Sequence, residues 1–166
     1  MEELDNSGEG SVRTNEFEGS QTLIVSIFSR FCAVPLRWVK EIMRPLPIEP
    51  VAGAPSFVPG LSIIRGLTTP VVDLGSVLGT PSGLRGRFVV VRTGDRQVAL
   101  SVGHVEGIRL LDRATLEKLP PLLGNAAGEI VEAIGTLDTH FLVVLQAGWE
   151  LPSEVWSAVD QKRAAR

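Results

Sequence analysis

The chain has 166 residues, of which 44% are apolar and 21% charged, and its formal net charge is −3. This size and composition are typical of one folded domain with a substantial core, and they exclude a chain that is disordered throughout. The acidic balance, with a pI near 5.4, provides no general basic field that would attract a phosphate backbone. We therefore expect a globular protein that has no nucleic acid partner.

The N-terminal segment and the single cysteine indicate a cellular location. Residues 1–20 are rich in Gly, Ser, Glu and Asn and poor in apolar side chains, which predicts a flexible tail. No apolar run approaches the roughly 18–20 residues that span a bilayer, and the acidic start lacks the pattern of a signal peptide. Cys32 has no second cysteine to pair with and lies in an apolar stretch. We expect a cytoplasmic protein with no direct membrane insertion.

From Thr22 onward the sequence predicts strands joined by turns. Two apolar runs, TLIVSIF from Thr22 and FCAVPL from Phe31, are separated by a short polar turn and predict a β-hairpin. The next segment, Arg37–Met43 (RWVKEIM), is too short for an independent helix and precedes several prolines, so it predicts one helical turn leading into an edge strand. The runs LSII and PVVDL then predict two strands with a bend at Gly66.

The second half of the chain contains a further hairpin signal. The stretch RFVVVRTGDRQVALSV, which begins at Arg87, has two β-branched runs on either side of Gly94 and Asp95. In its return strand the residues Val98, Leu100 and Val102 share one face, with Gln97, Ala99 and Ser101 on the other, which predicts a half-buried strand. The strand pattern continues to Leu111, with bends expected at Gly103 and Gly107.

The end of the chain predicts a last strand pair and a helix. Residues 130–136 and 141–145 are apolar runs around a polar turn, and Pro152 and Ser153 begin a helical pattern. So many short strands predict an all-β fold of sandwich or barrel type. We expect a tail over 1–20, a domain of two β subdomains over 21–151, and a C-terminal helix and tail over 152–166.

Candidate catalytic and metal-binding groups are few. The only histidines are His104 and His140, and neither has a partner at ligand spacing, while Cys32 stands alone. The segment PVVDLG around Asp73 resembles that of dimeric aspartic proteases, but Leu74 stands where those enzymes need a hydroxyl. We expect a protein that is not an enzyme and needs no cofactor or metal, and the alternative is a dimeric aspartic-type protease that uses Asp73.

Five segments together resemble the CheW family, the coupling proteins of bacterial chemosensory systems. They are VKEI from Val39, PSFVPG from Pro55, IIRG from Ile63, PVVDL from Pro70 and VALSVGHVEGI from Val98. The resemblance implies two packed five-stranded SH3-like β-barrels with short helices and no active site. It also implies an adaptor that bridges the tip of a methyl-accepting chemotaxis receptor and the regulatory domain of a CheA-like histidine kinase in receptor arrays.

The family pattern further implies two contact surfaces on this chain. We call the first the receptor groove; its expected residues are Val39, Glu41, Gly60, Arg65, Val105 and Ile108. Within it, the resemblance implies an ion pair between Glu41 and Arg65. The second is the kinase patch, with expected residues Val34, Pro35, Leu36 and Trp38.

Three positions depart from the family pattern. Ile63 stands where the family usually has Asn, Gly103 stands where it usually has the Asp of Val-Asp-x-Val, and Gln146 stands where it usually has a late Asp. These departures predict a diverged member. They leave open a CheW-like module that binds the kinase without a receptor.

Overall fold

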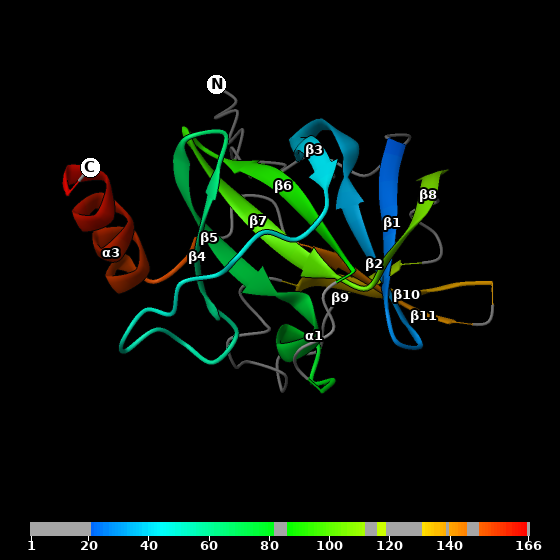
Figure 1. Ribbon diagram of the computed structural model, residues 1–166. Helices are drawn as coiled ribbons and strands as arrows, with labels where there is room; N and C mark the ends of the chain where they lie inside the picture. Colours follow the sequence, from blue (N-terminus) through cyan, green and yellow to red (C-terminus); the bar gives the residue numbers. More distant parts are fainter. Residues whose placement is uncertain are drawn as a thin grey trace, which may run out of the picture.

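The computed structural model describes residues 21–81, 86–111, 116–118, 131–138, 140–145 and 150–165. These residues form two β-sheets, short helical turns and one C-terminal helix (Figure 1). No helix within these ranges is long and apolar enough to cross a membrane. The tail expected over residues 1–20 lies outside the described residues.

The first sheet has six strands in the order β8-β1-β2-β11-β10-β9. Neighbouring strands are antiparallel except β2 and β11, which run parallel. The hairpin expected from Thr22 is confirmed as β1 and β2, and the last strand pair is confirmed as β10 and β11. The strands are β1 Gln21–Ile27, β2 Arg30–Pro35, β8 His104–Leu110, β9 Leu116–Lys118, β10 Val131–Leu137 and β11 His140–Leu145.

The second sheet has five strands in the order β3-β6-β7-β5-β4. The hairpin with the Gly94–Asp95 turn is confirmed as β6 and β7, and the bend at Gly66 joins β4 to β5. A 3-10 turn, η1 (Leu36–Trp38), leads into the edge strand β3 as expected. The strands are β3 Val39–Met43, β4 Gly60–Ile64, β5 Leu67–Asp73, β6 Arg87–Thr93 and β7 Arg96–Val102, and the helices are α1 Leu74–Val77 and α3 Ser153–Ala164.

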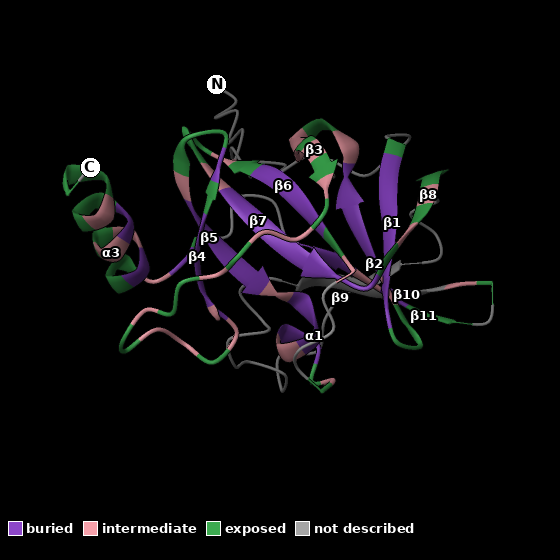
Figure 2. Ribbon diagram, in the orientation of Figure 1, coloured by how far each residue is buried: buried purple, intermediate pink, exposed green. Residues whose placement is uncertain are grey.

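One apolar layer is shared by the two sheets. Its residues come from β1 and β2 of the first sheet, from β5, β6 and β7 of the second, and from the start of α3. Two smaller clusters lie on the opposite faces, one around Ile24 and Leu142 and one around Phe88 and Val90. Strands β1, β2, β6 and β7 are therefore buried on both faces, and they are coloured as buried along most of their length in Figure 2.

The expectation that β7 is half-buried was wrong. The alternation is present, since Val98, Leu100 and Val102 belong to the shared layer. The other face is also covered, because Ala99 packs in the cluster around Phe88 and Ser101 is 2% exposed. A small residue such as Ala99 leaves room for the Phe88 ring. The face that carries Ala99 and Ser101 is not strongly apolar in sequence, so the alternation alone did not predict that this face is buried.

The all-β fold class is confirmed, with two packed β subdomains and a C-terminal helix. The first sheet has six strands because the three-residue β9 adds to β10.

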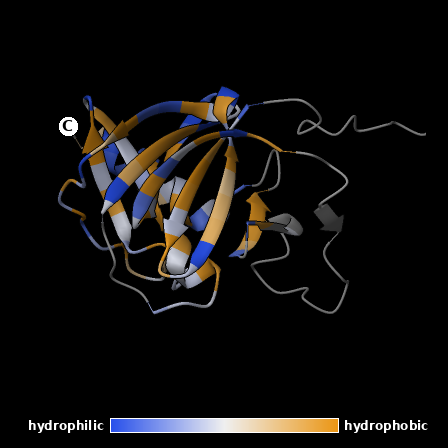
Figure 3. Cartoon of the chain, turned by 90° about the vertical axis from the view of Figure 1, so that its right-hand side faces the viewer, coloured by the Kyte–Doolittle hydropathy of each residue, from blue (hydrophilic) through white to orange (hydrophobic). Residues whose placement is uncertain are grey.

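Hydrophobic residues run along most of the strands, and hydrophilic residues occupy short segments of them (Figure 3). The division of the chain at residues 20 and 151 stays a prediction.

Two glycines allow the chain to pass from one sheet to the other. Gly103 separates β7 of the second sheet from β8 of the first, and its amide donates to the Ser26 carbonyl on β1 over 3.0 Å. The Gly86 amide donates to the Val102 carbonyl over 2.9 Å, and a Cβ atom at Gly86 would overlap the backbone carbonyl of Gly103. The crossing therefore requires that residue 86 has no side chain.

This close approach predicts that Gly86→Ala is strongly destabilising. We expect a loss of about 3 kcal/mol in the free energy of unfolding, because a backbone carbonyl cannot move aside as a flexible side chain can. Gly94→Ala is the matched control, since a Cβ there meets nothing within 4 Å and only the positive φ of 63° opposes it, which costs about 1 kcal/mol. Urea denaturation of both variants measures the difference, and equal losses would contradict the account.

Candidate functional site

An ion pair joins the two edges of the five-stranded sheet. Glu41 lies on the edge strand β3, and Arg65 lies in the turn between β4 and β5 at the other edge. The Arg65 Nε donates to both Glu41 carboxylate oxygens over 3.0 and 3.1 Å, and Nη2 donates to Oε2 over 2.9 Å. This arrangement confirms the ion pair that the sequence resemblance implied, and it connects strands that share no ladder.

The backbone at Arg65 adopts a conformation that is uncommon for a large side chain. Ile64 pairs with Leu67, so Arg65 and Gly66 form a two-residue hairpin loop, with φ values of 49° and 80°. Such a loop favours Asn or Gly at its first position, because a Cβ is crowded at positive φ. An arginine held there against that preference is consistent with a role for its side chain.

The pair also changes the ionisation of both groups. The hydrogen bonds from Arg65 lower the pKa of Glu41 below its ordinary value, and the bonds to Glu41 raise the pKa of Arg65. The Arg65 side chain is nevertheless 78% exposed, whereas that of Glu41 is 22% exposed. The carboxylate therefore holds the guanidinium in place while most of the arginine surface stays open to a partner.

A recess lies between β3 and the β4–β5 hairpin. A bulge at Lys40 interrupts the pairing of β3 with β6, which changes the direction of the side chains around Glu41. Lys40 donates to the Gln97 side chain on β7 over 2.6 Å and so closes one side of this recess. Its lining residues are Lys40, Glu41, Ile64, Arg65, Leu67 and Gln97.

Three further receptor-groove residues are apolar and lie on β3 and β8, which belong to different sheets. Val39 of β3 and Val105 of β8 are both half-buried and pack against the margin of the shared apolar layer. Ile108, on the edge strand β8, is 53% exposed. The structure thus places apolar groove residues on both sheets.

Gly60 does not lie with the ion pair. It begins β4, at the opposite end of that strand from Arg65, and is buried. A Cβ there would overlap the Glu49 carbonyl, because Leu61 and Glu49 form a backbone bridge with two hydrogen bonds of 2.8 Å. The geometry therefore gives Gly60 a structural role, and its assignment to the receptor groove stays a prediction.

The kinase patch is partly inside the core. Val34 is 0% exposed and belongs to the shared apolar layer, and Pro35 is also buried. Leu36 and Trp38 of η1 are half-buried and pack against the same layer. Within this patch, Leu36 and Trp38 are thus the residues with surface available for contact.

A known protein family matches most of this chain. The model of the CheW-like domain matches residues 21–148. The chain belongs to the CheW-like domain family. It is therefore a non-enzymatic scaffold protein of a chemosensory pathway.

Curated relatives include proteins from different bacteria. A Chemotaxis protein CheW from Klebsiella aerogenes is 24% identical over 87% of this chain and 89% of its own length. Protein FrzA from Myxococcus xanthus is 33% identical over 69% of this chain and 66% of its own. Protein PilI from Pseudomonas aeruginosa is 32% identical over 56% of this chain and 54% of its own.

A solved structure has the same fold. The crystal structure of the scaffolding protein TtCheW from Thermoanaerobacter tengcongensis superposes with a TM-score of 0.65 at 20% identity. The match covers 77% of this chain and 84% of that one. This likeness supports the all-β CheW-like fold described above.

The residues considered for catalysis do not form a catalytic group among the described residues of this CheW-like protein. Asp73 caps α1, since its carboxylate accepts from the Gly75 and Ser76 amides over 2.9 and 3.4 Å. Burial raises the pKa of the Cys32 thiol to about 12, so the thiol stays protonated and unreactive. His104 and His140 are exposed, and no group of metal-binding side chains occurs in the described part of the chain.

Sequence reasoning missed two features of the surface. Ile42 on β3 and Ile63 on β4 are 43% and 42% exposed on the edge strands. The Arg96 guanidinium lies 4.7 Å from the centre of the Trp156 ring on α3 and pairs with Asp160. The second arrangement joins residues about 60 positions apart, so no local pattern could reveal it.

The ion pair predicts a specific shift in the titration of Glu41. With Arg65 in place the pKa of the folded-state carboxyl is lowered, so its contribution to stability is present above the unfolded-state pKa and is lost as the pH falls through the folded value. In Arg65→Gln we expect the Glu41 pKa to rise toward its ordinary range. NMR titration of the side-chain carboxyl carbon measures this shift. Arg109→Gln is the control, because Arg109 pairs with Asp138 instead, and an unchanged Glu41 pKa in Arg65→Gln would contradict the assignment.

Proposed function

We propose that this CheW-like protein couples the tip of a chemotaxis receptor to the regulatory domain of a CheA-like histidine kinase. The observation that carries the proposal is the Glu41–Arg65 pair, which holds an exposed guanidinium beside the edge of one sheet. Family membership supports both partner classes, since CheW-like domains serve chemosensory pathways. The same proposal places the protein in the cytoplasm, recruited to receptor arrays.

The receptor side of the proposal uses both sheets. Val39 and Val105 pack on the margin of the shared layer, and the exposed Ile108 offers apolar area on β8. A helical receptor tip presents both apolar and charged side chains, which suits a surface that offers apolar area and a fixed cation. Arg65 would supply the directional contact and the aliphatic residues the buried area.

The kinase side of the proposal uses η1 at the end of β2. Leu36 and Trp38 combine partial exposure with anchoring in the shared layer. A tryptophan that is held by its own core loses little side-chain freedom on binding, which is a property of interface hot spots. Val34 and Pro35 would support this contact from beneath.

A second candidate function is a module that binds the kinase and no receptor. The observation that favours it is Ile63, which stands two positions before Arg65 and is 42% exposed. An apolar side chain there replaces the polar Asn of the family pattern and removes a potential hydrogen bond. The two candidates differ only in receptor binding, so one titration separates them.

The first prediction of this proposal concerns the kinase. In isothermal titration at protein concentrations up to about 100 μM, we expect saturable binding to the regulatory domain of the cognate kinase. Trp38→Ala is expected to weaken that binding by about tenfold, as the loss of one interface anchor does. Absence of heat of binding at the highest concentration, with both proteins folded, would refute the assignment.

The second prediction concerns Arg65 and the receptor. We expect Arg65→Glu to weaken binding of a receptor-tip fragment while the melting temperature hardly changes, because the side chain is 78% exposed. The exchange Glu41→Arg with Arg65→Glu restores opposite charges at the two positions and is the control. Continued weak binding in the exchanged variant indicates direct contact by Arg65. Restored binding, or a large loss of stability in Arg65→Glu, would show that Arg65 is only structural.

A further inference from the structure

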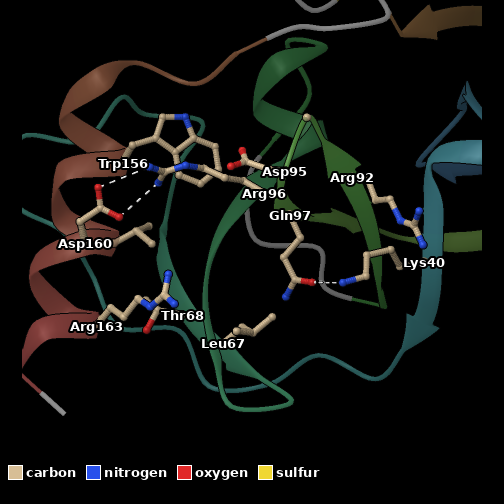
Figure 4. A pocket seen from close by; sticks show the side chains of 12 residues that line it. Lys40, Leu67, Thr68, Arg92, Asp95, Arg96, Gln97, Trp156, Asp160 and Arg163 are labelled. Atoms are coloured by element: carbon tan, nitrogen blue, oxygen red, sulfur yellow. Dashed lines mark hydrogen bonds and ion pairs between the residues drawn. The ribbon is translucent and has the colours of Figure 1, made fainter.

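A second groove lies between α3 and the turns of the five-stranded sheet. We call it the α3 groove; its volume is about 390 Å³. Leu67 and Trp156 give it apolar surface, and the Gly94–Asp95 turn borders it (Figure 4). It shares Lys40, Leu67 and Gln97 with the recess beside Arg65, so the two hollows are continuous.

The α3 groove is lined by more cations than anions. Its four basic residues are Lys40, Arg92, Arg96 and Arg163, against Asp95 and Asp160. Arg163 extends from α3 toward Thr68, and Arg92 and Lys40 lie on the opposite side (Figure 4). Arg96 is engaged by Asp160, but Arg92 and Arg163 are exposed and have no ionic partner among the described residues. The groove therefore presents unneutralised positive charge on both of its sides.

The charge of the chain is distributed unevenly between its start and the rest. Residues 1–20 contain six acidic residues and one basic residue, a formal charge of −5. The whole chain carries −3. The other 146 residues therefore carry +2. The acidic character of the protein thus comes from its first 20 residues, and a basic groove is the complementary surface on the remainder.

We propose that the acidic segment 1–20 of this chain docks in the α3 groove. Its acidic residues are Glu2, Glu3, Asp5, Glu9, Glu16 and Glu18, which places carboxylates along its whole length. These would neutralise Arg92 and Arg163 in an intramolecular complex, for which the tether supplies a high effective concentration.

The length of the segment permits this contact. Twenty residues span at most about 65 Å when extended, which exceeds the roughly 30–35 Å width expected of a domain of this size. The segment joins the fold at Gln21, next to Thr22, which pairs with Pro35. Pro35 is followed directly by η1 and then by Lys40 on β3, so the chain enters the fold on the side where the groove begins.

Docking would bring the segment close to Arg65. The α3 groove continues into the recess that Glu41 and Arg65 line. An acidic segment there would compete with a partner for the same cations. This consequence rests on the proposed function, whereas docking itself does not.

A spin label on the segment tests docking in the full-length protein. Ser11→Cys provides the site of attachment, because Cys32 is 0% exposed and does not react. In ¹⁵N spectra we expect loss of peak intensity for amides of Arg92–Gln97 and of α3 relative to the same sample with the label reduced. The double variant Arg92→Glu with Arg163→Glu, and separately about 0.5 M salt, should restore those intensities.

Two controls make the test decisive. Arg109→Glu makes the same charge change on β8 of the other sheet and should leave the loss in place. A mixture of spin-labelled unenriched protein with unlabelled ¹⁵N protein should show no loss, because the contact is within one chain. Undiminished intensities in the groove, a loss that survives both charge reversal and salt, or a loss in the mixture would overturn the proposal.

Discussion

The structure depends on one apolar layer that two β-sheets share. Strands β1, β6 and β7 contribute alternate residues to it, and their other faces pack in clusters within each subdomain. Such strands cannot shift register by one residue without exchanging two sets of buried side chains. The sheets are therefore held in a fixed relation, and the chain passes between them where Gly86 and Gly103 allow close backbone approach.

This constraint leaves the edges and margins of the sheets for function. Val39, Val105, Leu36 and Trp38 all pack at the border of the shared layer, where one side of each residue is anchored and the other is open. The Glu41–Arg65 pair connects the two edges of the five-stranded sheet and holds an exposed guanidinium beside β3. A scaffold requires such rigid, preformed contact points more than it requires a cavity.

Much of this could be predicted from local sequence patterns. The hairpins, the Gly66 bend and the turn before β3 follow from alternation and turn residues within short windows. The burial of Val34 and of the second face of β7 could not, because it depends on which surface another sheet covers. The Arg96–Trp156–Asp160 cluster depends likewise on where α3 packs. The role of Arg65 as a contact residue could be predicted only because the surrounding segments resemble a known family.

The central claim is that one molecule holds a receptor and a kinase at the same time. Sedimentation velocity of this protein with a receptor-tip fragment and the kinase regulatory domain tests it most directly. We predict a species that contains all three components, and no complex between the receptor-tip fragment and the kinase domain when this protein is left out. Separate complexes with each partner, and no species containing all three, would contradict the account.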